Sequence, residues 1–285
     1  MIALALKRMS GIPWVADYRD PWECLFPESI YIEGQDPWKI RAETEVAEWC
    51  VRGADLNLIN TTTACELFRE RFPDVDPQRF VTLPNGFDPT DFSGITRSTS
   101  AGDRLTFLHA GTFFPKLRTP DEFLAAIAEL VASQRIDPAR IRVRFAGCGP
   151  YPGMPPYVEV LPRAAHRDSL QMMADADVLL LLQQSEKYRM MAPAKTYEYM
   201  AVEKWILTLA PGGATRQLAE TLPNAVVVDP HDAEGIKAAI LRFYKQFVDG
   251  SLYPIPTDPE IMRRFTRQDQ SRVLASFFDD LAGQD

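Results

Sequence analysis

The stretch that decides the fold is residues 178–201, which read VLLLLQQSEKYRMMAPAKTYEYMA. Its first five residues, Val178 to Leu182, form the most apolar run in the chain, and this composition is typical of a strand buried on both faces of a parallel sheet. A polar segment follows at once, so it should lie at the carboxyl edge of that sheet. Open α/β folds bind their ligands at this edge, and we therefore expect a site there.

A helix begins shortly after this polar segment and supplies candidate ligand-binding groups. Pro193 suits the first turn of a helix, because the N–H group that proline lacks has no helical partner there in any case. Lys195 and Glu198 stand three residues apart and share a face near the positive end of the helix. A cation, a carboxylate and free backbone N–H groups suit a ligand with both phosphate and hydroxyl groups. The alternative interpretation is an ordinary i,i+3 ion pair on a surface helix.

Composition limits the class of protein. The chain has 285 residues, of which 46% are hydrophobic and 25% charged, which is ordinary for a globular protein of roughly two domains. The net charge of −8 argues against a nucleic-acid binder, which would carry a basic surface. The histidines lie too far apart in sequence to suggest a metal cluster. The four cysteines form no C-x-x-C pair, which predicts neither a disulfide framework nor a zinc site and fits the cytoplasm: Cys24, Cys50, Cys65 and Cys148.

Strands alternate with helices on both sides of a polar linker. The linker, residues 93–103, is dominated by Ser, Thr, Gly and Arg. Residues 1–92 and residues 104–259 each predict parallel strands joined by right-handed helical crossovers. We therefore expect an α/β fold with two Rossmann-like parallel-sheet domains that face a cleft, where the chemistry lies. A last helix, predicted at residues 260–281 in the segment 260–285, has one apolar side and is expected to pack back on the first domain.

The chain begins inside an expected element. Residues 1–6 (MIALAL) read as the interior of an amphipathic helix that ends near Gly11. The run is too short for the core of a signal peptide, and Lys7 and Arg8 stand on the wrong side of it. We therefore expect the first domain to be incomplete at its amino end.

A second candidate ligand-binding loop follows the strand predicted at residues 105–110. That strand ends at Gly111, and Lys116 and Arg118 stand in the loop after it. Glycine permits a ligand to approach the backbone, and a basic side chain neutralises phosphate charge, so the loop suits a diphosphate. Residues 119–122 (TPDE) then predict a capping box with proline at the first helical position. A solvated basic loop is the alternative interpretation.

A polar cluster also follows the strand predicted at residues 14–17. Asp17, Arg19 and Asp20 place two carboxylates and a guanidinium at the carboxyl end of this strand. They could position a general base or bind acceptor hydroxyls. An Asp–Arg ion pair that holds the loop in place is the alternative.

Two glycines follow the strand predicted at residues 141–146. Gly147 and Gly149 do not make a dinucleotide-binding fingerprint, because Pro152 stands where that pattern needs a further glycine. By themselves they are a weak signal of a ligand-binding turn.

Six motifs, taken together, resemble those of a known enzyme family. In order they are residues 17–22 (DYRDPW), 84–88 (PNGFD), 109–118 (HAGTFFPKLR), 147–150 (GCGP), 176–179 (ADVL) and 193–201 (PAKTYEYMA). Their order and spacing are similar to those of the GT-B glycosyltransferases of the family 4 or group 1 type, over nearly the whole chain. The resemblance implies a GT-B fold whose first domain is truncated.

The resemblance also implies an activity. It points to a retaining transferase that moves a sugar from a nucleotide diphosphate donor to an acceptor hydroxyl, in the synthesis of a glycan, polysaccharide or glycolipid. No metal or other cofactor is expected. The departing diphosphate would take the proton of the acceptor while cationic residues stabilise the leaving charge. A lipid acceptor would bring the protein into peripheral contact with a membrane.

Residue roles follow from the same resemblance. Lys116 and Arg118 would clamp the diphosphate, Glu198 would bind the donor ribose hydroxyls, and Lys195 would face the phosphates or the sugar. The implied donor-binding residues are Gly111, Thr112, Lys116, Arg118, Gly147, Gly149, Pro193, Ala194, Lys195 and Glu198. The implied acceptor-side residues are Asp17, Arg19 and Asp20, and the implied catalytic residues are Lys116, Arg118, Asp17 and Asp20.

The chain departs from the family pattern at two places. Many members carry a glutamate eight residues before the second one, where it contacts the donor sugar, and here that position is Met190. Glu186 lies four residues further upstream and is a poor substitute. The glycine-rich loop of the first domain, which approaches donor and acceptor, is not present in the sequence.

Three rival functions remain open. A metal-dependent GT-A transferase would place a D-x-D motif after an apolar strand, but residues 74–76 (DVD) fall in a predicted loop and residues 175–177 (DAD) precede a strand. A nucleotide-sugar epimerase or hydrolase could use the same fold, because a fold does not determine a reaction. A non-catalytic protein that only binds a nucleotide sugar would fit the shortened first domain.

Overall fold

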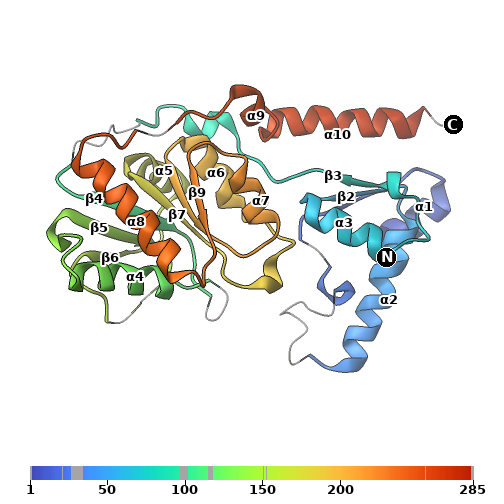
Figure 1. The fold of residues 1–285 in the computed structure, drawn as a ribbon. Helices are drawn as coiled ribbons and strands as arrows, with labels where there is room; N and C mark the ends of the chain where they lie inside the picture. Colours follow the sequence, from blue (N-terminus) through green and yellow to red (C-terminus); the bar gives the residue numbers. More distant parts are fainter. Residues whose placement is uncertain are drawn as a thin grey trace.

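The computed structural model describes residues 2–20, 22–26, 35–96, 102–114, 118–149, 151, 153–253 and 255–283. Its strands form two parallel sheets (Figure 1). The strands are β1 (Val15–Tyr18), β2 (Leu56–Ile59), β3 (Phe80–Thr82), β4 (Leu105–Ala110), β5 (Ile141–Ala146), β6 (Val158–Leu161), β7 (Val178–Leu182), β8 (Trp205–Leu209) and β9 (Ala225–Val228). The α-helices are α1 (Ile2–Ser10), α2 (Pro37–Gly53), α3 (Thr62–Arg71), α4 (Asp121–Ala132), α5 (His166–Asp175), α6 (Ala194–Val202), α7 (Ala214–Glu220), α8 (Ala233–Val248), α9 (Pro259–Arg263) and α10 (Arg267–Ala282). The prediction of an α/β fold with two parallel sheets is confirmed.

The smaller sheet has the strand order β1-β2-β3. Its central strand β2 is buried at every position, including the polar Asn57, whose Nδ2 atom donates a hydrogen bond of 3.2 Å to the Val51 carbonyl. Helices α2 and α3 cover one face, where Phe68 of α3 packs in one cluster with Tyr18 of β1 and Phe80 of β3. The smaller sheet and its two helices are therefore built around a hydrophobic core separate from those of the larger sheet.

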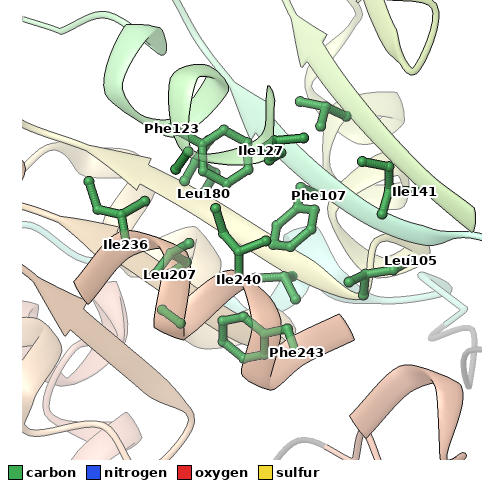
Figure 2. Close-up of a cluster of buried hydrophobic side chains, with 14 of the residues drawn as sticks. Leu105, Phe107, Phe123, Ile127, Ile141, Leu180, Leu207, Ile236, Ile240 and Phe243 are labelled. Carbon is green, nitrogen blue, oxygen red and sulfur yellow. The ribbon is translucent and has the colours of Figure 1, made fainter. Parts of the chain in front are cut away.

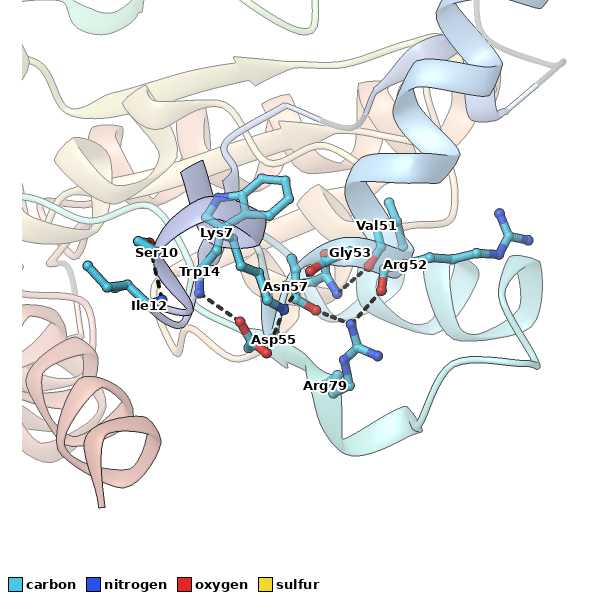
Figure 3. Close-up of polar contacts among 11 residues, drawn as sticks. Lys7, Ser10, Ile12, Trp14, Val51, Arg52, Gly53, Asp55, Asn57 and Arg79 are labelled. Atoms are coloured by element: carbon cyan, nitrogen blue, oxygen red, sulfur yellow. Dashed lines mark hydrogen bonds and ion pairs between the residues drawn. The ribbon is translucent and has the colours of Figure 1, made fainter. Parts of the chain in front are cut away.

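Helix α1 is attached to this sheet by a small polar network (Figure 3). Lys7 Nζ lies 2.7 Å from Asp55 Oδ1 and donates a hydrogen bond of 2.8 Å to the Gly53 carbonyl. The other carboxylate oxygen of Asp55 accepts from the Trp14 N–H at 2.7 Å. A Cβ atom on Gly53 would lie 2.5 Å from Leu4 Cδ1, so the absence of a side chain at residue 53 lets α1 pack closely on the end of α2.

The larger sheet has the strand order β6-β5-β4-β7-β8-β9. The chain winds outward from β4 to β6, returns to β7 beside β4, and winds outward again to β9. Strands β7 and β8 are fully buried, which explains the continuous apolar sequence of β7 and the apolar sequence of β8 outside Thr208. Helices α4 and α8 cover one face, where Phe107, Phe123 and Phe243 share a core (Figure 2). Helices α5, α6 and α7 pack against the other face.

The carboxyl-terminal segment differs from its prediction. The sequence predicted one helix from residue 260 to residue 281, whereas the chain forms α9, breaks, and then forms α10. At the break the Phe87 N–H donates to the Phe265 carbonyl at 3.0 Å, and the Arg267 N–H donates to the Phe87 carbonyl at 2.9 Å. Pairing with Phe87 satisfies backbone groups that a continuous helix would satisfy internally, so the helix is interrupted here.

Helix α10 lies against the smaller sheet, whereas α8 packs on the larger one (Figure 1). Leu274 and Phe277 of α10 pack on Leu56, Leu58 and Leu83, on the face opposite to α2 and α3. The end of the chain thus contributes to the core built around the first strands.

Candidate functional site

The carboxyl edge of the larger sheet brings two predicted ligand-binding loops together. Strand β4 pairs with β5 on one side and with β7 on the other, and the direction of winding reverses between β4 and β7. At such a switch point the loops after the two strands diverge and leave a crevice. The loop after β4 begins at Gly111, and the loop after β7 leads to α6, so both halves of the predicted donor site lie at this edge.

Gln184 joins the two loops. Its Oε1 atom accepts a hydrogen bond of 2.8 Å from the Thr119 N–H, and its Nε2 atom donates to the Thr119 carbonyl and, at 3.0 Å, to the Glu122 carboxylate. The predicted capping box is wrong. In a capping box the Glu122 side chain would accept from the Thr119 N–H, but here both groups bond to Gln184 instead. Helix α4 begins at Asp121, and Pro120 precedes it instead of forming its first residue.

Lys195, from the first turn of α6, reaches the end of β4. Its Nζ atom lies 3.4 Å from Nε2 of His109, whose ring is completely buried. The other ring nitrogen, Nδ1, lies 2.9 Å from the Leu180 carbonyl oxygen in β7. Because a carbonyl only accepts hydrogen bonds, Nδ1 carries the ring hydrogen and Nε2 is left to accept one from Lys195. The imidazole also stacks on Phe113, with ring centroids 5.2 Å apart, which fixes its plane.

The electrostatic surroundings disfavour a charge on Lys195. Burial and the nearby positive charge of Arg118 lower the pKa of Lys195 to about 7, although the carboxylate of Glu198 acts in the opposite direction. Burial, followed by the charge of Lys195, keeps the pKa of His109 well below its usual value, so the imidazole is neutral at physiological pH. An anion beside Lys195 would favour the ammonium form, and the site is therefore suited to a phosphate ligand.

Gly111 lies directly against the ammonium group. A Cβ atom at this position would stand 2.0 Å from Lys195 Nζ, and the φ angle of +141° disfavours any other residue. Its N–H donates to the Ala146 carbonyl at 2.8 Å and holds the loop at the end of β5. The sequence predicted a glycine that admits a ligand; in the structure the space beside it is occupied by Lys195.

Glu198 meets a histidine and not Lys195. Its Oε1 atom lies 3.1 Å from Nε2 of His166, the first residue of α5. Within the described residues Glu198 and Lys195 form no ion pair, so the alternative interpretation of the two as a surface pair is wrong. The Glu198 side chain keeps 28% of its surface exposed and is open to a ligand with hydroxyl groups.

Arg118 closes the loop that starts at Gly111. Its backbone pairs with Phe114 in both directions, with hydrogen bonds of 2.8 and 2.9 Å, and its guanidinium lies 5.7 Å from the centre of the Phe114 ring. This stacking holds a cation close enough to Lys195 to affect its pKa. Lys116, the other predicted clamp residue, lies outside the described residues.

The glycines after β5 make a turn at the same edge. Gly147 and Gly149 have φ angles of +78° and +83°, a conformation that favours glycine, and the Gly147 N–H donates to the Leu161 carbonyl at 3.1 Å. Because β5 is the neighbour of β4, this turn lies next to the loop at Gly111.

The remaining donor-side residues are at the surface of this edge. Thr112 and Ala194 are exposed, and Ala194 is the first residue of α6. Pro193 precedes the helix instead of forming its first residue: its ψ angle is 142°, and its carbonyl accepts the Thr196 N–H at 2.9 Å.

The predicted acceptor-side cluster lies at the carboxyl edge of the smaller sheet. The Asp17 carboxylate pairs with the Arg19 guanidinium at 2.5 Å. The guanidinium also donates to the Leu83 carbonyl at 3.1 Å and the Pro84 carbonyl at 3.3 Å, so it holds the end of β3. The alternative interpretation, an ion pair that stabilises a loop, describes the contacts of Arg19. Asp20 is exposed.

Met190, the position at which the family motif carries a glutamate, joins the two halves of the chain. Its side chain is buried in the same hydrophobic cluster as Phe68 and Tyr18, although it comes from the loop after β7. Its carbonyl accepts a hydrogen bond of 2.6 Å from Thr61 Oγ1, which also caps α3 through the Ala64 N–H. Glu186, the substitute considered above, is exposed. At the position where the glutamate of the family motif contacts the sugar, this chain therefore has a side chain that serves in packing.

Sequence reasoning missed three residues of this edge: His109, His166 and Gln184. The histidines were considered only as metal ligands and set aside for their distance in sequence. One signal was available, because His109 is an ionisable residue inside an apolar strand two positions before Gly111 and so projects on the same side of β4. No comparable signal exists for His166, since its contact with Glu198 depends on how α5 packs beside α6.

Two other kinds of site are not found in the part of the chain that the structure describes. None of its groups of His, Cys, Asp and Glu is arranged as a set of three or more metal ligands. No helix among these residues has the length and apolar character needed to cross a membrane.

The fold is similar to several solved glycosyltransferase structures. HepE from Anabaena, solved in complex with UDP, is 15% identical; the match covers 98% of this chain and 75% of HepE, with a TM-score of 0.69. Sucrose-phosphate synthase from Thermosynechococcus elongatus is 14% identical over 99% of this chain and 71% of that chain, with a TM-score of 0.70. α,α-Trehalose-6-phosphate synthase from Burkholderia multivorans is 11% identical over 98% of this chain and 68% of that chain, with a TM-score of 0.66. A search among curated protein sequences finds no match.

The family model for glycosyl transferases group 1 matches residues 104–246. These residues include strands β4 to β9, the loop at Gly111 and the start of α6, so the match covers the candidate site itself. It confirms the resemblance that the sequence motifs indicated. The chain belongs to the group 1 glycosyl transferases and has the GT-B fold.

Proposed function

We propose that the chain transfers a sugar from a nucleoside diphosphate sugar to an acceptor hydroxyl with retention of configuration. The observation that carries the proposal is the geometry at the switch point of the larger sheet. Lys195 is half-buried between Gly111 and His109, with a pKa lowered to about 7, and it lies close to the charge of Arg118. Lys195 and Arg118 thus bring two positive charges close together at one edge of the sheet, and a diphosphate has the charge and size to bind beside both.

The second half of the donor would lie near α6. Glu198 is partly exposed and is held by His166, so its carboxylate is oriented before any ligand binds. A carboxylate in this position suits the ribose hydroxyls of a nucleotide, because two vicinal hydroxyls can both donate to it. The diphosphate leaving group would then gain its charge beside Lys195 and Arg118, which stabilise it as the sugar departs. No metal is needed in this scheme.

The ligands of similar solved structures agree with this donor class. HepE was solved with UDP and glucose, and a pneumococcal O-GlcNAc transferase with UDP and GlcNAc. We propose a nucleoside diphosphate hexose as the donor, and a glycan, polysaccharide or lipid hydroxyl as the acceptor. Asp17, Arg19 and Asp20 are proposed to line the acceptor side.

A second candidate is a protein that binds the nucleotide sugar without transferring it. The observation that favours it is Met190, which replaces the first glutamate of the family motif and is used to pack the two sheets together. A chain of this kind would bind the donor at Lys195 and Glu198 but would lack a contact to the sugar.

Glu198→Ala tests the donor site directly. We expect this variant to bind UDP-glucose or the preferred donor about tenfold to a hundredfold more weakly, because charge-assisted hydrogen bonds worth about 1.5–3 kcal/mol are lost. Calorimetric titration measures the dissociation constant. Glu220→Ala is the matched control, since Glu220 pairs with Arg216 on the exposed side of α7.

The two candidate functions are separated by turnover. A panel of UDP, ADP and GDP sugars is incubated with and without sugar and glycolipid acceptors, and nucleotide release and product anomer are measured. Acceptor-dependent release with retained configuration supports the transferase. Donor binding with no release supports the binding protein, and release that does not depend on an acceptor contradicts both. An unchanged donor dissociation constant in Glu198→Ala would mean that the site is misassigned.

A further inference from the structure

His109 lies beside Lys195 but has no chemical role in the proposed transfer, and its side chain is completely buried. Three contacts determine its position. Nδ1 is hydrogen-bonded to the Leu180 carbonyl at 2.9 Å, the ring stacks on Phe113, and Nε2 lies 3.4 Å from Lys195 Nζ. A buried polar group is costly unless it is hydrogen-bonded, so each ring nitrogen has a partner with a definite role.

The contacts leave one protonation state. The Leu180 carbonyl requires a hydrogen on Nδ1, and burial keeps the ring neutral, so Nε2 has a lone pair directed at Lys195. Burial and the charge of Lys195 disfavour an imidazolium, so Nε2 accepts a hydrogen bond from Lys195 without taking its proton. The imidazole therefore orients Lys195 and does not act as its base.

We infer that His109 is a positioning residue for donor binding: Nε2 accepts one N–H of Lys195 and directs the other ammonium hydrogens to the place where the donor diphosphate would lie. This inference rests on the proposed function. Gly111 completes the arrangement, because a Cβ atom there would occupy the position of Nζ. Lys195 is thus bonded to an acceptor on β4, and the absence of a side chain at Gly111 leaves room for its Nζ atom.

A proton should accompany the nucleotide into this site. With a pKa of about 7, Lys195 is mostly neutral at pH 8 before the ligand binds. A diphosphate favours the ammonium form, so Lys195 takes a proton from the buffer and becomes charged. The protonated form is the binding form, and affinity is therefore lost as the pH rises through 7, by about fivefold between pH 7 and pH 8.

Other charged or titratable groups lie near Lys195, and their contribution to the pH dependence must be distinguished from that of Lys195. They are Arg118 on the loop after β4, and Glu198 on α6, which is held by His166 on α5. The buried phenol of Tyr199, which accepts the Ala110 N–H at 3.0 Å, has a pKa raised chiefly by burial and stays neutral in this range. Lys195→Met removes the proposed titrating group and leaves these others in place.

Two substitutions of His109 separate positioning from structural support. In His109→Asn the side-chain amide can occupy the place of Nδ1 and keep the bond to Leu180, but it does not reach Lys195. In His109→Gln the longer amide can place its oxygen near the position of Nε2 and accept from Lys195, while the bond to Leu180 is lost. The two variants thus each retain one of the two hydrogen bonds.

The experiment is calorimetric titration with UDP, ADP and GDP at pH 6, 7 and 8 in buffers of different ionisation enthalpy. The wild type should take up close to one proton per nucleotide at pH 8, where the ligand phosphates are fully ionised, and Lys195→Met should take up none. His109→Asn should bind about tenfold more weakly at pH 7, with less proton uptake, and His109→Gln should lie closer to the wild type. Wild-type affinity and proton uptake in His109→Asn, or a larger loss in His109→Gln, overturn the inference.

A measurement on the wild type guards against variants that fold poorly. Two-bond ¹H–¹⁵N correlation spectra of the histidine rings should show the Nδ1–H tautomer of His109 from pH 6 to pH 9, and its Nε2 signal should shift when UDP is added. An Nε2–H tautomer, or an imidazolium in this range, contradicts the inference even if every variant unfolds. If no nucleotide binds the wild type, the proposed function fails, whereas the tautomer still tests how His109 and Lys195 are arranged.

Discussion

The two sheets place charged residues at the same kind of edge, yet the charges are in opposite situations. At the smaller sheet, Arg19 is neutralised by Asp17 and bonded to the Leu83 and Pro84 carbonyls. At the larger sheet, Lys195 is half-buried beside another cation, and its nearest partner is the neutral ring of His109. Both clusters look alike in sequence. The comparison shows that a charged residue at a strand end indicates a ligand site when the folded chain places no oppositely charged residue in contact with it.

Met190 links the two edges, and its truncation should have the largest effect. Met190→Ala empties a space in the core shared by Phe68 and Tyr18, which costs about 2–5 kcal/mol of folding free energy. Urea denaturation measures the change in midpoint. Met9→Ala is the control, because the Met9 side chain is 84% exposed. Equal midpoints for the two variants would show that Met190 does not hold the edges together.

Lys195→Met removes the cation that lacks a counter-charge. We expect a tenfold to hundredfold loss of nucleotide affinity, because charge-assisted hydrogen bonds of about 1.5–3 kcal/mol disappear. The methionine side chain replaces the aliphatic part of the lysine side chain. Stability should be unchanged or higher, since a partly buried charge is removed. Lys245→Met, on an exposed position in the last turn of α8, is the control for both measurements.

Gly111→Ala tests the space reserved for Lys195. The positive φ angle alone should cost about 1–2 kcal/mol of stability, and the new Cβ atom should also displace Nζ and weaken nucleotide binding. Gly250→Ala is a matched control, because Gly250 has a φ of +67° but nothing within 4 Å of the added atom. Thermal unfolding should shift in both variants, whereas calorimetry should detect weaker binding in Gly111→Ala alone.

Asp17→Asn should have the smallest effect. The Asp17 side chain is 48% exposed, and an exposed ion pair contributes at most about 1 kcal/mol. The dissociation constant of the donor should stay the same, because Asp17 belongs to the other sheet, while the KM for the acceptor should rise. A large loss of donor affinity would contradict the separation of the two edges.

Much of the fold could be predicted because each strand and helix has a recognisable local pattern of apolar and polar residues. The apolar run from Val178 to Leu182 indicated a strand buried on both faces, and the structure places it at the centre of the larger sheet. The break between α9 and α10 could not be predicted, since residues 260–281 are compatible with one helix. It depends on pairing with Phe87, more than 170 residues earlier in the chain.

The candidate site was predictable in its location but not in its contacts. Gly111, Lys195 and Glu198 were found because strand ends and helix starts can be recognised from the sequence. The partners of these residues were not found: Lys195 and Glu198 are close in sequence, yet each meets a histidine from another element. Helical spacing shows which side chains share a face, but it does not show what packs opposite that face.

By itself the sequence determined the α/β class, the two groups of parallel strands, and the strand ends at which a ligand site could form. It did so because apolar runs and helix starts depend on neighbours in the chain. Only the tertiary structure decided which charges are neutralised: Arg19 by Asp17 and two carbonyls, Lys195 by no counter-ion among the described residues. The physical reason is that a charge is neutralised by groups close to it in space, and the packing of helices on sheets, not the order of residues, selects those groups.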